Sequence, residues 1–281
     1  MKILITGAKG MLGRTLCRRL ASHDIVVFDL PEGDITDATT VNDVFQKERP
    51  AVVIHAAAMT AVDDCETNIK EAFRINRDGS AIVAEASTSV GARLIAISTD
   101  YVFDGELDRP YHEEDVPNPL TIYGKSKLAG EECVLSKCPN AAILRTAWLY
   151  GPGGPSFVHT MLRLGSETGE PVRVVNDQRG NPTSSDALAS LIEQFIDRHE
   201  PGVFHATCEG EATWFDLARA VFSLKGFDRS IVPCRSDEYP KPAVRPKNSR
   251  LENRELRLKG YQPLLHWLDA LQAFLKERPK E

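Results

Sequence analysis

Short apolar runs alternate with amphipathic segments along the first half of the chain. Runs rich in apolar and β-branched side chains predict strands at residues 2–6, 25–29, 51–58, 92–98 and 141–150, with two more at 171–175 and 203–207. Apolar side chains at helical spacing predict helices at residues 11–20, 39–49, 68–90 and 121–137. Strands that are apolar throughout are buried on both faces, as parallel strands are. The pattern therefore predicts an α/β fold with a doubly wound parallel sheet of the Rossmann type.

The alternation loosens after residue 150, where prolines interrupt it repeatedly. We expect residues 1–150 to form a dinucleotide-binding domain, with later strand and helix contributions from residues 177–206. Residues 151–176 and 207–281 are expected to form a smaller, interleaved substrate-binding lobe.

Composition narrows the class of protein. The 281 residues are 42% hydrophobic and 26% charged, which is ordinary for a globular chain, and the net charge of -6 argues against a nucleic-acid partner. No stretch approaches the roughly 20 apolar residues of a membrane span, and no signal peptide is visible. The six cysteines form no CxxC pair and suit neither zinc nor a disulfide framework. We expect a cytoplasmic enzyme without a metal site.

A glycine-rich loop follows the first predicted strand and opens the first predicted helix. Its glycines are Gly7, Gly10 and Gly13, spaced GxxGxxG. Such a loop lets backbone amides approach a pyrophosphate, and the helix N-terminus favours the negative charge. Between a strand and a helix, this loop predicts dinucleotide binding more strongly than a plain turn.

Two nearby residues bear on which dinucleotide binds. Asp29 closes the second predicted strand, where a carboxylate accepts from ribose hydroxyls and repels a 2′-phosphate. Lys9, in the loop, is a cation that could pair with that phosphate. We expect either NADH or NADPH, with NADH slightly favoured by Asp29.

Thr99, Tyr123 and Lys127 form the candidate catalytic set. Tyr123 and Lys127 make a YxxxK motif, which places both on one helix face. The lysine charge is expected to lower the pKa of the phenol, so that Tyr123 can protonate a carbonyl oxygen as hydride arrives. Thr99 ends an apolar strand, and ligands in such sheets bind at the carboxyl ends of the strands. Together these residues predict an oxidoreductase.

The motif order resembles the extended short-chain dehydrogenase/reductases, and more closely the dTDP-4-dehydrorhamnose reductase family. The matching segments cover most of the chain: 7–13, Gly33-Asp34-Ile35, 56–63, 98–105, 123–127, 145–151, 177–183 and 245–251. The last two are the most specific, because they lie outside the generic nucleotide-binding pattern. Dehydratases of this fold usually carry Thr-Asp-Glu, whereas Tyr101 follows Asp100 here, which favours simple reduction over elimination.

The resemblance implies roles for the matching positions. It implies cofactor contacts from Gly7, Gly10, Met11, Leu12, Gly13, Asp29, Asp34, Ile35, Ala58, Met59, Thr60, Ile97, Tyr123 and Lys127. It implies substrate contacts from Thr99, Asp100 and Trp148. It gives Asn76 a supporting part in a proton relay. For Arg145, a structural ion pair and a ligand contact stay equally open, and for Trp148 core packing is the alternative.

The function implied is reduction of the C4 keto group of dTDP-4-dehydro-β-L-rhamnose by NAD(P)H, in dTDP-rhamnose biosynthesis. Two alternatives stay open: a reductase of another nucleotide-linked deoxy-keto-sugar, and a non-catalytic regulatory subunit resembling the methionine adenosyltransferase β subunit. An intact Tyr123 and Lys127 favour the enzyme. The chain has long helices that could pair two copies across a two-fold axis, so a homodimer is possible.

Overall fold

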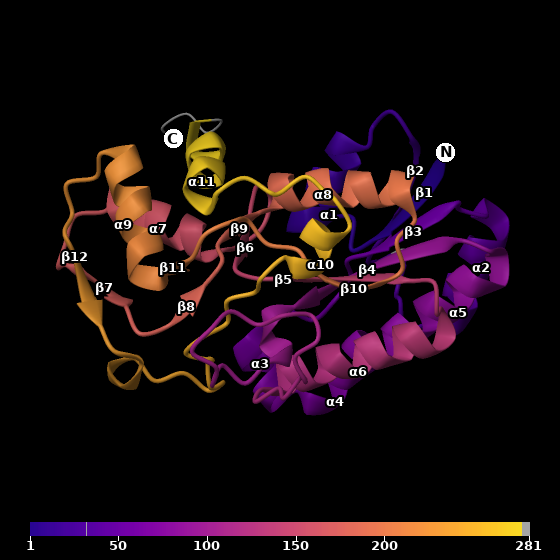
Figure 1. Cartoon of the computed structure of the whole chain (residues 1–281), viewed down its shortest axis with the longest axis horizontal. Coiled ribbons are helices and arrows are strands. Elements are labelled where there is room, and N and C mark those ends of the chain that lie inside the picture. The colour runs from indigo at the N-terminus through magenta and orange to yellow at the C-terminus, as the bar shows by residue number, and fades with distance from the viewer. Residues whose placement is uncertain (32, 277–281) are drawn as a thin grey trace.

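A parallel sheet in the strand order β10-β5-β4-β3-β1-β2 forms the centre of the molecule (Figure 1). The computed structural model describes residues 1–31 and 33–276. The strands of this sheet are β1 (Lys2–Thr6), β2 (Asp24–Phe28), β3 (Val52–His55), β4 (Arg93–Thr99), β5 (Ala142–Thr146) and β10 (Gly202–His205). The chain reverses its direction of winding between β1 and β3, so a crevice for a ligand is expected at the carboxyl ends of these two strands.

Helices cover both faces of the sheet (Figure 1). On one face lie α1 (Met11–Arg19) and α8 (Ser185–Arg198); on the other lie α2 (Ala38–Glu48), α5 (Ser80–Val90) and α6 (Ile122–Lys137). Side chains alternate along each strand, so Ile3 and Ile5 enter the core beneath α1 and α8, whereas Leu4 enters the core beneath α2 and α5. Both faces are thus buried, as the apolar strand runs predicted.

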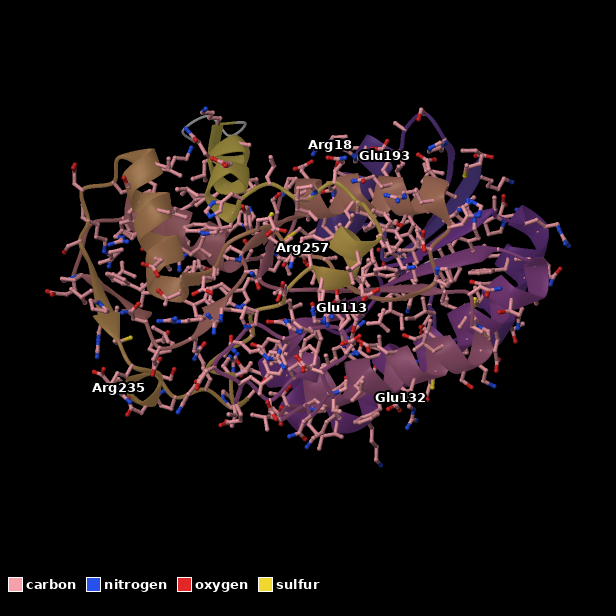
Figure 2. The ribbon with its side chains drawn as sticks, viewed as in Figure 1. Arg18, Glu113, Glu132, Glu193, Arg235 and Arg257 are labelled. Carbon is pink, nitrogen blue, oxygen red and sulfur yellow. The ribbon has the colours of Figure 1, made fainter. Side chains whose placement is uncertain are left out.

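Ion pairs join the outer surfaces of α1 and α8. Arg18 pairs with Asp186 at 2.6 Å and Arg19 with Glu193 at 2.8 Å. Figure 2 shows Arg18 and Glu193 on these two helices. Such exposed pairs contribute little free energy, so the apolar contacts between the helices dominate their packing.

The smaller elements lie mainly beyond the carboxyl end of the sheet. Short helices line that end: α3 (Val62–Thr67), α4 (Ile69–Phe73), the π turn η1 (Arg74–Gly79) and the 3-10 turn η2 (Asp100–Val102). Two-stranded pairings join β6 (Leu149–Tyr150) with β9 (Thr183–Ser184), β8 (Arg179–Gly180) with β11 (Ala212–Thr213), and β7 (Val172–Val175) with β12 (Ile231–Cys234). The remaining helices are α7 (Phe157–Ser166), α9 (Trp214–Lys225), the 3-10 turn η3 (Ser236–Glu238), α10 (Arg254–Leu258) and α11 (Trp267–Lys276).

The predicted α/β fold with its parallel sheet is confirmed, but two elements differ. The strand predicted at 171–175 is present as β7, which pairs with β12 outside the main sheet. The run 141–150 is broken after β5, where Trp148 takes a positive φ of 46° and the chain turns into β6. The helix expected at 68–90 is divided by the π turn η1. The lobe boundaries stay a prediction.

Within residues 1–31 and 33–276, no helix combines the length and the apolar character needed to cross a bilayer.

Candidate active site

The glycine-rich loop closes tightly over the carboxyl end of β1. Gly7 has a φ of +68°, and a Cβ there would lie 2.7 Å from the amide nitrogen of Ala57, which follows β3. A Cβ on Gly13 would lie 2.1 Å from the carbonyl oxygen of Gly7. Gly10 precedes α1 without a side-chain cap, so amides of the first helical turn are left without intrahelical partners. This cradle fits the pyrophosphate of a dinucleotide, which such amides bind.

Asp29 and Lys9 meet at the edge of this loop. The carboxylate of Asp29 accepts from the backbone amides of Lys9 and Leu30, each at 2.7 Å. The ammonium group of Lys9 donates to the carbonyl of Leu30, also at 2.7 Å. The two residues that bear on the choice between NADH and NADPH therefore lie side by side at the edge of the loop.

Asp34 and Ile35 follow in the next loop and point in different directions. Asp34 accepts from the amide and the hydroxyl of Thr36, and these bonds hold the pKa of its carboxyl below the usual value. The side chain of Ile35 is buried in the core against α5. Any contact from Ile35 to a ligand would therefore have to come from its backbone.

The segment after β3 carries Ala58, Met59 and Thr60. Ala58 and Met59 are half-buried and Thr60 is exposed. Asn76 holds this segment from the π turn: its Oδ1 accepts from the amide of Met59 at 2.8 Å, and its Nδ2 donates to the carbonyl of Met59 at 3.1 Å. A π turn interrupting a helix often marks a functional site.

The structure brings the predicted catalytic residues together at the carboxyl end of β4. Thr99 is the last residue of β4, and Tyr123 and Lys127 lie one turn apart on α6; all three are buried. Helix α6 approaches this end closely because Gly124 has no Cβ, which would lie 2.1 Å from the carbonyl oxygen of Tyr101. The ammonium group of Lys127 donates to the carbonyl of Ile97 at 2.8 Å.

Burial is the main influence on the pKa values of Tyr123 and Lys127. It raises the pKa of Tyr123, against a smaller lowering by a hydrogen bond with Thr99. Burial lowers the pKa of Lys127 to about 8, which the charge of Glu131 partly offsets. The expected lowering of the Tyr123 pKa is therefore not found, because the loss of hydration disfavours the phenolate. Tyr123 stays protonated at neutral pH, as a proton donor must.

Asp100 lies beside Thr99 with one carboxylate oxygen free. Thr99 donates to its Oδ1 at 3.0 Å, whereas Oδ2 is buried without a hydrogen-bond partner among the described residues. Burial raises the pKa of Asp100 to about 6, and the hydrogen bond from Thr99 partly counters this effect. A polar hydrogen of a ligand is the natural complement of Oδ2.

Trp148 forms one side of an aromatic pair that the sequence analysis missed. Its indole stacks on Trp214, with ring centroids 3.5 Å apart and planes inclined by 4°. Its Nε1 donates to Ser249 Oγ at 3.2 Å. Trp214 begins α9, more than sixty residues later, and no local pattern marks it. Trp148 is half-buried, so its side chain can pack against Trp214 and still contact a ligand.

A second pairing that the sequence analysis missed lies near Tyr101. Arg245 forms a two-pronged ion pair with Asp63, at 2.6 and 2.8 Å. Tyr101 packs edge-on against Tyr123, with ring centroids 5.5 Å apart. Both members of the ion pair lie in the matching segments of the sequence, but only the fold shows that they meet.

Arg145 forms a structural ion pair. Its guanidinium contacts the carboxylate of Glu131 through Nε at 3.0 Å and Nη2 at 2.6 Å. Of the two roles left open by the sequence, the structure favours this one.

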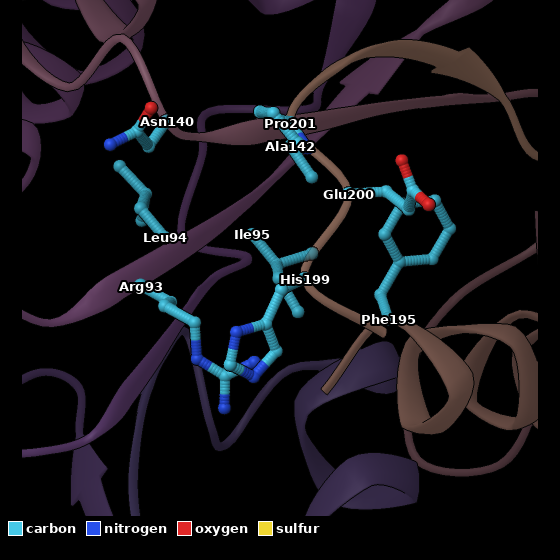
Figure 3. Close-up of a pocket in the computed structure, with 9 residues that line it drawn as sticks. All are labelled: Arg93, Leu94, Ile95, Asn140, Ala142, Phe195, His199, Glu200 and Pro201. Atoms are coloured by element: carbon cyan, nitrogen blue, oxygen red, sulfur yellow. The ribbon is translucent and has the colours of Figure 1, made fainter. Parts of the chain in front are cut away.

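A cavity of about 270 Å³, whose lining side chains are drawn in Figure 3, contains none of the candidate site residues in its lining. It is lined by Arg93, Leu94, Ala142, Phe195 and His199, near the amino-terminal ends of β4 and β5. Arg93 donates to the carbonyl of Ile196 at 2.6 Å, which ties down the end of α8. The cavity therefore has no part in the candidate active site. Among the described residues, no group of three or more His, Cys, Asp or Glu side chains could hold a metal ion.

Comparisons with known proteins agree with this geometry. Residues 1–279 match the family model described as RmlD substrate binding domain. A dTDP-4-dehydrorhamnose reductase of Streptomyces griseus is 44% identical, covering 95% of this chain and 91% of the relative. A dTDP-4-keto-6-deoxy-D-glucose reductase of Streptomyces niveus is 41% identical, covering 96% of each. The crystal structure of dTDP-4-dehydrorhamnose reductase from Bacillus anthracis in complex with NADP has a TM-score of 0.96 at 40% identity, covering 99% of each chain.

Proposed function

This chain belongs to the RmlD substrate binding domain family, and on that premise we propose that it reduces the C4 keto group of dTDP-4-dehydro-β-L-rhamnose to dTDP-L-rhamnose with NAD(P)H. One observation carries the proposal: a buried, protonated Tyr123 lies with Thr99 at the carboxyl end of β4, and strand β1, on the far side of β3 in the same sheet, ends in the dinucleotide cradle. A hydride source and a proton donor are what reduction of a carbonyl requires.

The cofactor would be held by the loop at residues 7–13, by Asp29 and Asp34, and by Ala58, Met59, Thr60 and Ile97. When bound, the reduced nicotinamide supplies the hydride. Thr99 and Tyr123 hydrogen-bond the keto oxygen, and the phenolic proton passes to that oxygen as the carbon is reduced. Lys127, still largely protonated at neutral pH with a pKa of about 8, stabilises the resulting phenolate.

For the sugar nucleotide, we assign contacts to Asp100 and Trp148. The unpartnered Oδ2 of Asp100 would accept from a sugar hydroxyl. The half-buried indole of Trp148, backed by Trp214, offers an apolar surface to a ring. Both lie outside the nucleotide cradle, which supports a part for them in selecting the substrate.

We infer that NADH is used and that NADPH is tolerated. The carboxylate of Asp29 repels a 2′-phosphate, and Lys9 lies at the same edge with its ammonium group on the Leu30 carbonyl. Asp29→Ser should shift the ratio of kcat/KM for NADPH over NADH upward by about tenfold, as expected for one removed repulsion. An unchanged ratio would mean that Asp29 does not set the preference.

The test of function follows oxidation of NADH and of NADPH with enzymatically prepared dTDP-4-dehydrorhamnose, and identifies the product. Robust turnover to dTDP-L-rhamnose is expected. The 41% identity to a dTDP-4-keto-6-deoxy-D-glucose reductase makes that sugar nucleotide the second candidate, so it is assayed in parallel. Turnover of neither substrate, beside tight binding of a protein partner, would favour the regulatory-subunit alternative. A homodimer and a cytoplasmic location stay predictions.

A further inference from the structure

His55 is a buried histidine, 2% exposed, at the last position of β3. Each ring nitrogen has a hydroxyl partner. Nδ1 lies 2.8 Å from Thr6 Oγ1, at the end of β1, and Nε2 lies 3.0 Å from Ser80 Oγ, at the start of α5. The imidazole therefore bridges the strand before the glycine-rich loop and the helix after the π turn.

The neighbours of His55 determine where its proton lies. Ser80 Oγ donates its hydrogen to the carbonyl of Asn76 at 2.7 Å, and a carbonyl can only accept. Ser80 must therefore accept from His55, which places the proton on Nε2. The bare Nδ1 then accepts from the hydroxyl of Thr6, whose oxygen in turn accepts from the amide of Ala57 at 3.3 Å. From the amide of Ala57 to the carbonyl of Asn76, every hydrogen bond in this series is therefore donated in the same direction.

The same network continues to the catalytic helix. Asn76 Nδ2 donates to Ser126 Oγ at 2.9 Å, and Ser126 donates to the backbone carbonyl of Tyr123, also at 2.9 Å. The other contacts of Asn76 fix both backbone groups of Met59. Helix α6 can approach because Gly130 has no Cβ, which would lie 2.2 Å from the carbonyl oxygen of Asn76.

The site keeps His55 neutral. Burial lowers its pKa to about 3, and the positive charge of Lys127 adds to this effect. His55, Ser80 and Lys127 line one small cavity between the sheet and α6. A neutral imidazole is both a donor and an acceptor, as this chain of hydrogen bonds requires.

We propose that His55 is a positioning residue: through Thr6 and Ser80 it sets the place of residues 57–59 and of Asn76, and thereby aligns the nicotinamide site with Tyr123. The inference rests on the proposed function, in which residues 58–60 face the cofactor. The buried side chain of His55 is not among the groups assigned to substrate or cofactor. Its effect should therefore appear in cofactor binding and hydride transfer, and not in binding of the sugar nucleotide.

Ser80→Ala tests this, with Ser87→Ala as the matched control. Ser87 is a buried serine on the same helix, and its hydroxyl donates to the carbonyl of Val83 at 2.7 Å, outside the network. We expect the NADPH Kd, from nucleotide fluorescence, to rise about tenfold in Ser80→Ala, roughly one buried hydrogen bond, and to change less than about twofold in Ser87→Ala. The KM for NADPH should follow the Kd while the KM for the keto-sugar stays constant.

Thr6→Val removes the partner on the other side of His55. If Ser80→Ala does not fold, the NADPH Kd of Thr6→Val is compared with that of Ser87→Ala in the same way. Nitrogen-15 NMR of the histidines should show His55 as the neutral Nε2–H form between about pH 5 and pH 8. Equal NADPH Kd values for the network variant and Ser87→Ala, or an Nδ1–H tautomer, would overturn the proposal. Because the Kd is measured without sugar, a wild type that fails to reduce the keto-sugar would sink the proposed function and leave this comparison intact.

Discussion

The guanidinium group of Arg145 and the carboxylate of Glu131 form an ion pair in which each side chain is only 5% exposed. The pair joins β5 to helix α6, where Glu131 lies four residues beyond Lys127. Arg145 also lies over the ring of Phe103 at 5.2 Å. Removing one member would leave the other charge buried without its counterion, which costs far more than the pair contributes.

Glu131→Gln should therefore destabilise the protein by about 3–5 kcal/mol, measured as the free energy of unfolding in urea. Glu193→Gln is the matched control, because it breaks the exposed pair with Arg19 on α1. That change should cost less than about 1 kcal/mol. Similar losses for the two variants would show that burial does not determine the contribution of the inner pair.

Tyr123→Phe should lower kcat by about 100-fold to 10,000-fold, because the proton donor is removed. The NADPH Kd should stay within about twofold, since no cofactor hydrogen bond is assigned to the proton that is lost. Tyr150→Phe is the control: its hydroxyl is buried without a hydrogen-bond partner among the described residues. Equal activity of the two variants would remove Tyr123 from the mechanism.

Asp100 should make stability depend on pH in the acid range. Its pKa is raised from 3.8 to about 6 in the folded protein, so between these values the folded state binds more protons than the unfolded state. The protonated carboxyl of Asp100 therefore contributes on the order of 3 kcal/mol to the free energy of unfolding. This contribution is fully present below about pH 4 and is lost as the pH rises through about 6. Asp100→Asn should abolish this component in urea unfolding at a series of pH values. If the free energy of unfolding changed with pH in the same way in the wild type and in Asp100→Asn, the raised pKa of Asp100 would be contradicted.

Gly180→Ala should disturb the sugar-nucleotide site through Trp148. A Cβ at Gly180 would lie 2.4 Å from Trp148 Cε2, so the indole must move. We expect the KM for the keto-sugar to rise about tenfold while the NADPH Kd is unchanged. Gly165→Ala is the matched steric control, because its Cβ would lie 2.2 Å from the ring of Phe227, which follows the carboxyl end of α9, whereas Trp214 begins that helix. A rise in KM from Gly165→Ala alone would mean that Trp148 does not contact the sugar.

Much of the architecture could be predicted because it depends on neighbouring residues. The predicted strand at 2–6 coincides with β1, and the predicted helices at 11–20 and 121–137 differ from α1 and α6 by one residue. Periodicity predicts a strand at 171–175 but cannot say which strand it pairs with, and only the fold shows that β7 pairs with β12. The positive φ that breaks the run at Trp148 also leaves no local mark, since tryptophan does not favour that conformation.

By itself, the sequence determined the order of strands and helices, the glycine spacing of the cradle and the family resemblance, because these are written in adjacent positions. Only the tertiary structure decided that Arg145 pairs with Glu131, that Trp148 stacks on Trp214, and that His55 connects β1 with α5. Those pairings depend on which distant segments meet. The raised pKa of Tyr123 belongs to the same class. A lysine four residues away predicts a lower pKa, but the loss of water around a buried phenol is a property of the whole fold and outweighs it.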